Sequence, residues 1–328
     1  MKNKILVFFM YIVTGVNNMT IAPLLLLTMP FTKYFLVKYC NIFILSYSYL
    51  VRLYYNVKVY ISNKDIMHDM LDSNNKEHSI VISNHMSQFD FLYFYNLLAV
   101  KNYIQSIQFK FVAFYYLYLF PGVGILAYLT DCIQISNNKK RSLDNINNCK
   151  LGKNDILFIY PEGSTYRQTL LDKSNEYCDK NNIERTKLCL YPRDVGLNII
   201  DKNNNIDTIY SLWMQFDKPH EKDYYGVIQK DIPKTVYIKL NKHLIENMNI
   251  SNKTVEIFRD IDTHLLKGLD KNEYELLEPS YCEKLCFLSY TSLFSFLIYA
   301  LYESSYFRYY LSTTTTLYYL YLCYHMKV

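Results

Sequence analysis

Short runs rich in β-branched and aromatic residues alternate with helical runs through the middle of the chain, and this alternation restricts the possible folds more than any other feature. The expected strands are residues 79–83, 155–160, 188–191, 206–216 and 235–240. The expected helices are residues 89–100, 111–120, 139–150, 169–181 and 251–266, the last with Ser251 as its N-cap. Strands that alternate with helices are typical of a layered α/β domain. We therefore predict a mixed sheet with flanking helices over residues 56–267.

Both ends of the chain are apolar over lengths that suit a lipid bilayer. Residues 5–27 are nearly free of charge, a second apolar stretch runs over 34–51, and residues 285–302 and 306–324 form two Tyr-rich stretches. A helix needs about 20 apolar residues to span a membrane. The first stretch suits a single span or a re-entrant hairpin, and the C-terminal pair suits a membrane hairpin or core or interfacial helices. We predict membrane helices at both ends, with a retained anchor in place of a cleaved signal peptide.

Charge and cysteine usage exclude several classes of function. The net charge is +5 without a long basic run, which argues against a nucleic-acid partner. The cysteines are scattered, and the close pair Cys282 and Cys286 has no second pair or histidine at zinc-finger spacing. We expect reduced thiols, no metal site and no nucleic-acid partner.

A histidine and an aspartate follow the expected strand 79–83. Residues 84–90 read NHMSQFD, which places His85 and Asp90 five positions apart. Residues at that spacing point about 140° apart on a helix, so these two side chains can meet only across a bend. Ser87 and Asp90 have the spacing of a capping box, which predicts a helix that starts at Ser87 and leaves His85 in the preceding turn.

This pair suits general-base chemistry. A carboxylate that holds an imidazole fixes its tautomer and stabilises the imidazolium that forms when a proton is taken. If the attacked group is a thioester, its thiol leaves readily, since the reference pKa of such a thiol is about 8.5, and only the attacking hydroxyl needs activation. Taken alone, however, a histidine and an aspartate at this spacing arise often by chance.

A second polar block follows the expected strand 155–160. Residues 161–167 read PEGSTYR. Pro161 ends the strand, and Gly163 permits a positive φ. We expect the peptide N–H groups around Gly163 and Ser164 to turn outward as an anion-binding nest.

The charged residues of this block differ in their expected roles. Arg167 supplies a cation near the nest. A carboxylate beside a phosphate would be repelled, so we expect Glu162 to hold a ribose or glycerol hydroxyl or to organise a cation. An ordinary Pro-Gly turn is the alternative when the block is taken alone.

Together the two blocks resemble the glycerolipid acyltransferase family, whose members acylate lysophosphatidic acid, glycerol phosphate and related lysophospholipids. That family carries a His and an Asp separated by four residues and, further along the chain, a Pro-Glu-Gly-Thr or Pro-Glu-Gly-Ser block; here the interval is 77 residues (162 − 85). The segments at 121–135, 190–196 and 206–210 agree in order, and the last resembles the branch that contains lysocardiolipin acyltransferase. The resemblance covers about residues 79–216.

The resemblance implies an enzyme that moves a fatty acyl group from acyl-CoA, as co-substrate, to a lysophospholipid hydroxyl at a bilayer. It implies that His85 is the general base and Asp90 its orienting acid, and it implies no further cofactor. The substrate-binding residues that it implies are Glu162, Gly163, Ser164, Arg167, Pro192 and Arg193.

The expected organisation combines these predictions. Residues 1–55 would be a membrane anchor or re-entrant helices, 56–267 the acyltransferase domain, 268–284 a connector and 285–328 a hydrophobic helical hairpin. We expect an integral membrane protein of the endoplasmic reticulum whose catalytic domain faces the cytosol, where acyl-CoA is supplied.

Two departures from the family pattern motivate alternatives. Ser136 stands where the family usually has a basic residue, with Lys139, Lys140 and Arg141 a few positions on, and Ser164 replaces the commoner Thr. The missing basic residue is the reason to consider a non-catalytic protein that keeps the fold for lipid binding or scaffolding. A lipase or esterase that uses a serine of either block would need a nucleophile elbow and a nearby second histidine, which the sequence lacks.

Overall fold

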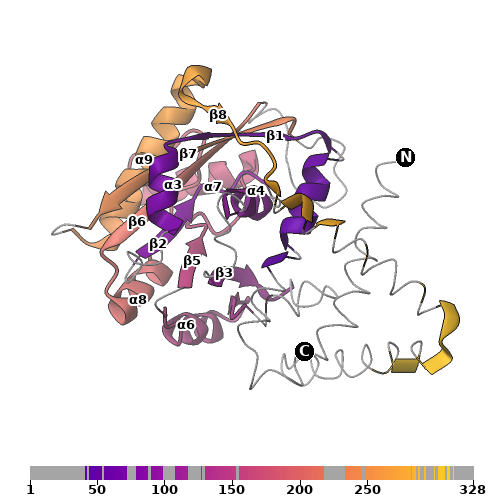
Figure 1. Cartoon of the computed structure of the whole chain (residues 1–328). Helices are drawn as coiled ribbons and strands as arrows, with labels where there is room; N and C mark the ends of the chain where they lie inside the picture. Colours follow the sequence, from indigo (N-terminus) through magenta and orange to yellow (C-terminus); the bar gives the residue numbers. More distant parts are fainter. Residues whose placement is uncertain are drawn as a thin grey trace.

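The computed structural model of the chain describes residues 41–71 except 43 and 54, then 79–87, 90–98, 108–116, 127, 130–152, 155–217, 233–245 and 248–281, with scattered residues from 283 to 313. The described residues form a mixed sheet of eight strands with helices on both faces (Figure 1). The predicted layered α/β fold is confirmed.

The order of the strands decides where the two polar blocks lie. In sheet order the strands are β4 (Ile133–Ile135), β3 (Gln108–Phe114), β5 (Asp155–Ile159), β2 (Ser79–Ser83), β6 (Thr208–Phe216), β7 (Thr235–Leu244), β1 (Lys58–Ser62) and β8 (Glu275–Leu276). Neighbouring strands are parallel except for the pairs β6/β7 and β1/β8. Because β2 and β5 are adjacent and parallel, the residues that follow them emerge at the same edge of the sheet.

Helices cover both faces of the sheet and bury alternate side chains of its strands. On β2, Val81 joins one apolar cluster while Ile80 and Ile82 join the other, because successive side chains of a strand point to opposite faces. The face of Val81 is covered by α3 (Lys64–Leu71) and α4 (Asp90–Leu98), and the opposite face by α6 (Lys139–Asn147), α8 (Val195–Asn204) and α9 (Ile250–Lys267). Every residue of β2 is buried, which explains its unbroken apolar run in the sequence.

Most of the predicted elements are confirmed within a few residues. The final helix, α9, begins just before the predicted start, because the side chain of Asn249 rather than that of Ser251 caps it and accepts the N–H of Ser251 at 2.9 Å. The confirmed elements are the strands at 79–83, 155–160, 206–216 and 235–240 and the helices at 89–100, 139–150, 169–181 and 251–266.

Two predicted elements are wrong. Residues 111–114 of the helix expected at 111–120 belong instead to strand β3, which pairs with β5 on one side and β4 on the other, and residues 117–120 lie outside the described residues. Its aromatic and β-branched residues suit a strand once partners are present on both sides. The strand expected at 188–191 does not form; these residues lie in a loop whose backbone is held by side chains, as described below.

Among the described residues, no helix combines the length and the apolar character needed to cross a membrane. The apolar stretch at 5–27 lies outside the described residues, and those at 34–51, 285–302 and 306–324 lie partly outside them. The membrane helices stay a prediction.

Candidate active site

Asn84 directly follows β2, and its side chain continues the pairing of β2 with β6 by one residue. Its side-chain Nδ2 donates to the backbone oxygen of Met214 at 2.8 Å, and its Oδ1 accepts the N–H of the same residue at 2.8 Å. The amide side chain thus imitates a peptide group of the neighbouring strand. This anchors the start of the turn from which His85 projects.

His85 and Asp90 meet across the bend between β2 and α4. His85 Nδ1 lies 3.0 Å from Asp90 Oδ2. The side chain of His85 is 20% exposed, whereas that of Asp90, the first residue of α4, is fully buried. A neutral imidazole in this pair donates its Nδ1 proton to Asp90 and keeps the lone pair of Nε2 for an incoming proton.

The carboxylate of Asp90 also organises the turn that carries the histidine. Its Oδ2 accepts the backbone N–H groups of Met86 at 2.7 Å and Ser87 at 2.9 Å. The bond from Ser87 is the one that the predicted capping-box spacing requires of the acidic residue. Burial raises the pKa of Asp90, and the hydrogen bonds from His85, Ser87 and Met86 act in the opposite direction.

Tyr160, the last residue before the second block, packs its ring flat against His85. The two ring centroids are 3.9 Å apart and the rings are inclined by 17°. Burial, with the nearby charge of Asp90, raises the pKa of Tyr160 well above its ordinary value, so its hydroxyl stays protonated. Sequence reasoning missed Tyr160; the only signal was an aromatic residue directly before Pro161.

The second block forms a tight turn after β5. Gly163 has a φ of 70°, the conformation that its lack of a side chain was expected to permit. Its N–H donates to the backbone oxygen of Tyr160 at 3.0 Å. The expectation that this N–H turns outward in an anion-binding nest is therefore wrong, because the turn itself uses the donor.

Glu162 lies beneath both turns and joins them. Its carboxyl group accepts hydrogen bonds from the backbone of His85 and of Leu190, and only 2% of the residue is exposed. The backbone N–H of Tyr166 adds a further link to the oxygen of His85 at 2.7 Å. Burial raises the pKa of Glu162 well above its ordinary value. The structure thus gives this carboxyl a place under the histidine turn, where its bonds go to the backbone.

The segment at 190–196, which contains Pro192 and Arg193, completes the arrangement. The N–H of Arg193 donates to the backbone oxygen of Pro161 at 2.8 Å. The Arg193 side chain lies over Gly163, where an added Cβ would come within 3.3 Å of its Cδ and Nε atoms. Pro192 is buried, Arg193 is exposed, and Ser164 and Arg167 are half-buried. The candidate residues of the two blocks and of the segment at 190–196 therefore lie around one edge of the sheet.

The basic residues near Ser136 lie farther along the same edge. Ser136 directly follows β4, which is separated from β2 by β3 and β5. Three strand spacings amount to about 14 Å. Lys139 and Lys140 begin α6 there and are exposed. These cations therefore follow a strand that is three positions away in the sheet from the strand that precedes His85.

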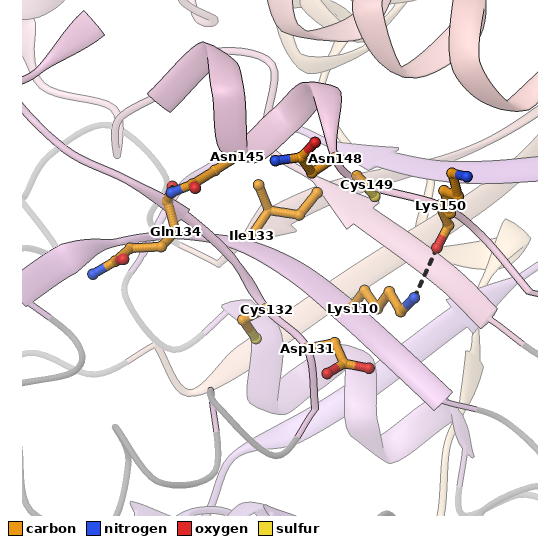
Figure 2. Close-up of a pocket in the computed structure, with 9 residues that line it drawn as sticks. All are labelled: Lys110, Asp131, Cys132, Ile133, Gln134, Asn145, Asn148, Cys149 and Lys150. Atoms are coloured by element: carbon orange, nitrogen blue, oxygen red, sulfur yellow. Dashed lines mark hydrogen bonds between the residues drawn. The ribbon is translucent and has the colours of Figure 1, made fainter. Parts of the chain in front are cut away.

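A cavity of about 460 Å³ lies near the opposite ends of the strands. Its lining includes Lys110 on β3, Cys132 before β4 and Lys150 before β5, and Figure 2 shows Lys110 donating to the backbone oxygen of Lys150. The ammonium of Lys110 is also 2.6 Å from Asp155. The cavity contains none of the predicted site residues. Among the described residues, no cluster of histidine, cysteine or acidic side chains suits a metal ion.

The region that holds the two turns matches a known protein family. A family model described as Acyltransferase matches residues 58–189. This region of the chain matches an acyltransferase family. The matched residues include His85, Asp90 and the Glu162 turn, whereas Pro192 and Arg193 lie just beyond them. The resemblance to the glycerolipid acyltransferase family is confirmed.

The chain is also similar to one group of curated relatives. Lysocardiolipin acyltransferase 1 of Gallus gallus is 20% identical over 191 residues, which cover 56% of this chain and 50% of the relative. The Mus musculus protein of that name gives the same values, and that of Danio rerio is 19% identical over 181 residues. The chain therefore spans about half the length of the curated relatives it matches.

Proposed function

We propose that the acyltransferase domain transfers a fatty acyl group from acyl-CoA to the free hydroxyl of a lysophospholipid such as lysophosphatidic acid. The observation that carries the proposal is the contact of His85 Nδ1 with the buried Asp90 carboxylate at 3.0 Å, beside the turn of Glu162. The curated relatives support the substrate class through their names. Phospholipid synthesis or remodelling is the process that this reaction serves.

The proposed reaction is a direct transfer with His85 as the general base. His85 Nε2 takes the proton of the acceptor hydroxyl while the hydroxyl oxygen attacks the thioester carbonyl carbon. The carbon–sulfur bond then breaks, an ester forms, and the CoA thiolate leaves and is protonated by the imidazolium. Asp90 stabilises that imidazolium through Nδ1. No covalent bond to the protein forms at any stage.

The acceptor side of the proposed site is basic. Arg193 and Arg167, from two separate segments, suit the phosphate of a lysophospholipid, because a guanidinium binds phosphate oxygens in pairs. Ser164, half-buried in the same turn, offers a hydroxyl to the same group. Gly163 lets the Arg193 side chain lie close to the turn.

The proposed setting is a bilayer. The apolar stretches in 1–55 and 285–328 are the reason to propose that the protein is held in a membrane, and the need for acyl-CoA is the reason to propose that the domain faces the cytosol, with the endoplasmic reticulum as the organelle. Glycosylation mapping of Asn249 and Asn252, which begin formal acceptor sequons, tests the orientation. Sugar on either asparagine would place the domain in the lumen.

Acyl transfer by microsomes that express the chain tests the reaction. A panel of lysophospholipids is offered with labelled acyl-CoA to the wild type, His85→Ala and Asp90→Asn. We expect both substitutions to lower transfer by about 10²- to 10⁴-fold, because the first removes the general base and the second removes the carboxylate that orients it. His243→Gln is the matched control, since His243 lies on β7 and bonds to Ser211.

Two outcomes would contradict the proposal. Normal turnover by His85→Ala would remove the mechanism. Absence of transfer by the wild type with every acceptor would favour the alternative of a non-catalytic lipid-binding or scaffolding protein with the same fold.

A further inference from the structure

The segment from Lys187 to Arg193 bends at residues 187–189 and belongs to no helix or strand. Each backbone N–H in it is held by a group outside the segment. Tyr191 donates to Ser174 Oγ at 2.8 Å, Arg193 donates to the oxygen of Pro161 at 2.8 Å, and the carboxyl of Glu162 accepts the backbone of Leu190. Because Pro192 has no N–H, the three donors of Lys187, Leu188 and Cys189 complete the set.

Those three donors converge on one carboxylate, that of Asp262. Its Oδ1 accepts Lys187 at 3.0 Å and Cys189 at 3.0 Å and also accepts Leu188, while its Oδ2 accepts Lys187 at 3.0 Å. The residue is only 7% exposed. Charge-assisted bonds of this kind are stronger than bonds between neutral groups.

The helix that carries Asp262 is itself firmly placed. On α9, Ile257, Phe258, Ile261 and Leu265 all belong to the apolar cluster that covers one face of the sheet. Asp262 lies next to Ile261 on this helix and reaches from it to the segment. The packing of α9 therefore sets the position of the carboxylate, and the carboxylate sets the position of the segment.

The far end of the segment is the part that faces the proposed acceptor. Arg193 lies over Gly163, close enough that a Cβ there would touch its Cδ and Nε. A shift of the segment by a fraction of an ångström would move the guanidinium away from that turn. Asp262 lies outside the residues that the family model matches.

We propose that Asp262 is a positioning residue for Arg193, and that it supports binding of the anionic headgroup of the acceptor. The inference rests on the proposed function, which makes Arg193 a substrate-binding residue. Asp262 does not itself touch substrate. It acts by holding the start of the segment whose end presents the guanidinium.

The test compares Asp262→Asn with the wild type in the full chain, with lysophosphatidic acid as the probe. Asparagine keeps one acceptor oxygen but loses the charge, so we expect the KM and the Kd for lysophosphatidic acid to rise about tenfold, equivalent to about 1.4 kcal/mol. We expect kcat and the KM for acyl-CoA to stay within about twofold, because the His85–Asp90 pair is not displaced. Asp260→Asn, which removes the same charge from an exposed position of α9, should change neither constant.

A double-mutant cycle separates positioning from general damage. In an Arg193→Gln background the KM and the Kd for lysophosphatidic acid have already risen, and adding Asp262→Asn should change them by less than about twofold. Ser174→Ala, which removes the partner of the Tyr191 N–H, is the milder second variant; it should raise the same constants about threefold and show the same non-additivity. This variant keeps the test decisive if Asp262→Asn melts at a much lower temperature.

The outcomes distinguish this inference from the proposed function. Equal effects of Asp262→Asn in the wild-type and Arg193→Gln backgrounds, or a parallel loss of kcat and of affinity for both substrates, would overturn the positioning role. A wild type that binds lysophosphatidic acid in an Asp262-dependent manner but transfers no acyl group would refute the proposed function alone.

Discussion

His85 is held on several sides by groups that leave one ring nitrogen for chemistry. Asp90 binds Nδ1, Tyr160 covers one face of the ring, the N–H of Tyr166 binds the backbone oxygen, and Glu162 binds the backbone on the other side. Of these contacts, those with Asp90 and Tyr160 act on the orientation of the ring itself. A base that is already oriented loses less entropy when the reaction begins.

Replacing Tyr160 tests whether the stacked ring orients His85. We expect Tyr160→Leu to lower kcat about tenfold, because stacked aromatic pairs contribute about 0.5–1.5 kcal/mol beyond their buried area. Tyr160→Phe keeps the ring and should keep kcat within about threefold, since the Tyr160 hydroxyl has no hydrogen-bond partner among the described residues. Steady-state acyl transfer measures both, and an equal loss in the two variants would contradict an orienting role of the ring.

At the scale of elements, the ends of β2, β5 and the Lys187–Arg193 segment are joined by side chains. Asn84 extends the pairing of β2 with β6, and Glu162 bridges the backbone of the β2 turn and that of the segment. These loops pair with no strand, so buried side chains must satisfy their backbone donors. The carboxyl of Glu162 does so from a site where ionisation is unfavourable.

The pH dependence of the melting temperature tests whether the pKa of the Glu162 carboxyl is raised in the folded protein. A carboxyl whose folded pKa is raised binds its proton more tightly in the folded state, so its stabilising contribution is complete below the unfolded pKa of about 4.3 and is lost as the pH rises towards the folded value. We expect the melting temperature of the wild type to fall relative to that of Glu162→Gln as the pH increases from 5 towards the raised pKa. A constant difference between the two proteins across this range would contradict the raised pKa.

At the scale of the whole molecule, a buried polar cluster ties distant parts of the chain together. Arg52 Nη1 is 3.5 Å from Glu283 Oε1, which also accepts Asn96 Nδ2 at 2.7 Å, and Asn96 donates in turn to Ser48 Oγ at 2.7 Å. The second Arg52 nitrogen, Nη2, donates to the oxygen of Leu277. The cluster thus joins residues that precede the domain in the chain, and residues that follow it, to α4, the helix that begins with Asp90.

Breaking this cluster tests its contribution to the fold. Glu283→Ala leaves the Arg52 guanidinium buried without its carboxylate, so we expect the free energy of unfolding to fall by about 3–5 kcal/mol. The double variant Arg52→Met, Glu283→Leu removes both charges and should be more stable than Glu283→Ala alone. Chemical denaturation of the purified chain measures both. A double variant less stable than the single one would contradict the unpaired Arg52 charge as the cause of the loss.

Several features of the fold and the site could be predicted from local sequence. The strands β2 and β5 are unbroken apolar runs that end at polar blocks, and the five-residue spacing of His85 and Asp90 required a bend between them. Residues 111–114 were wrongly predicted to be helical, because their aromatic and β-branched side chains belong to β3, which pairs with β4 and β5.

The sequence by itself determined which residues end the buried strands and which of them carry charge, since these properties depend on neighbours along the chain. Only the tertiary structure decided that β2 lies beside β5, that Tyr160 covers His85, and that Asp262 on α9 holds the Lys187–Arg193 segment. Hydrogen bonds between residues 73 or more positions apart depend on how the sheet and its helices assemble, and no local pattern along the chain encodes that assembly.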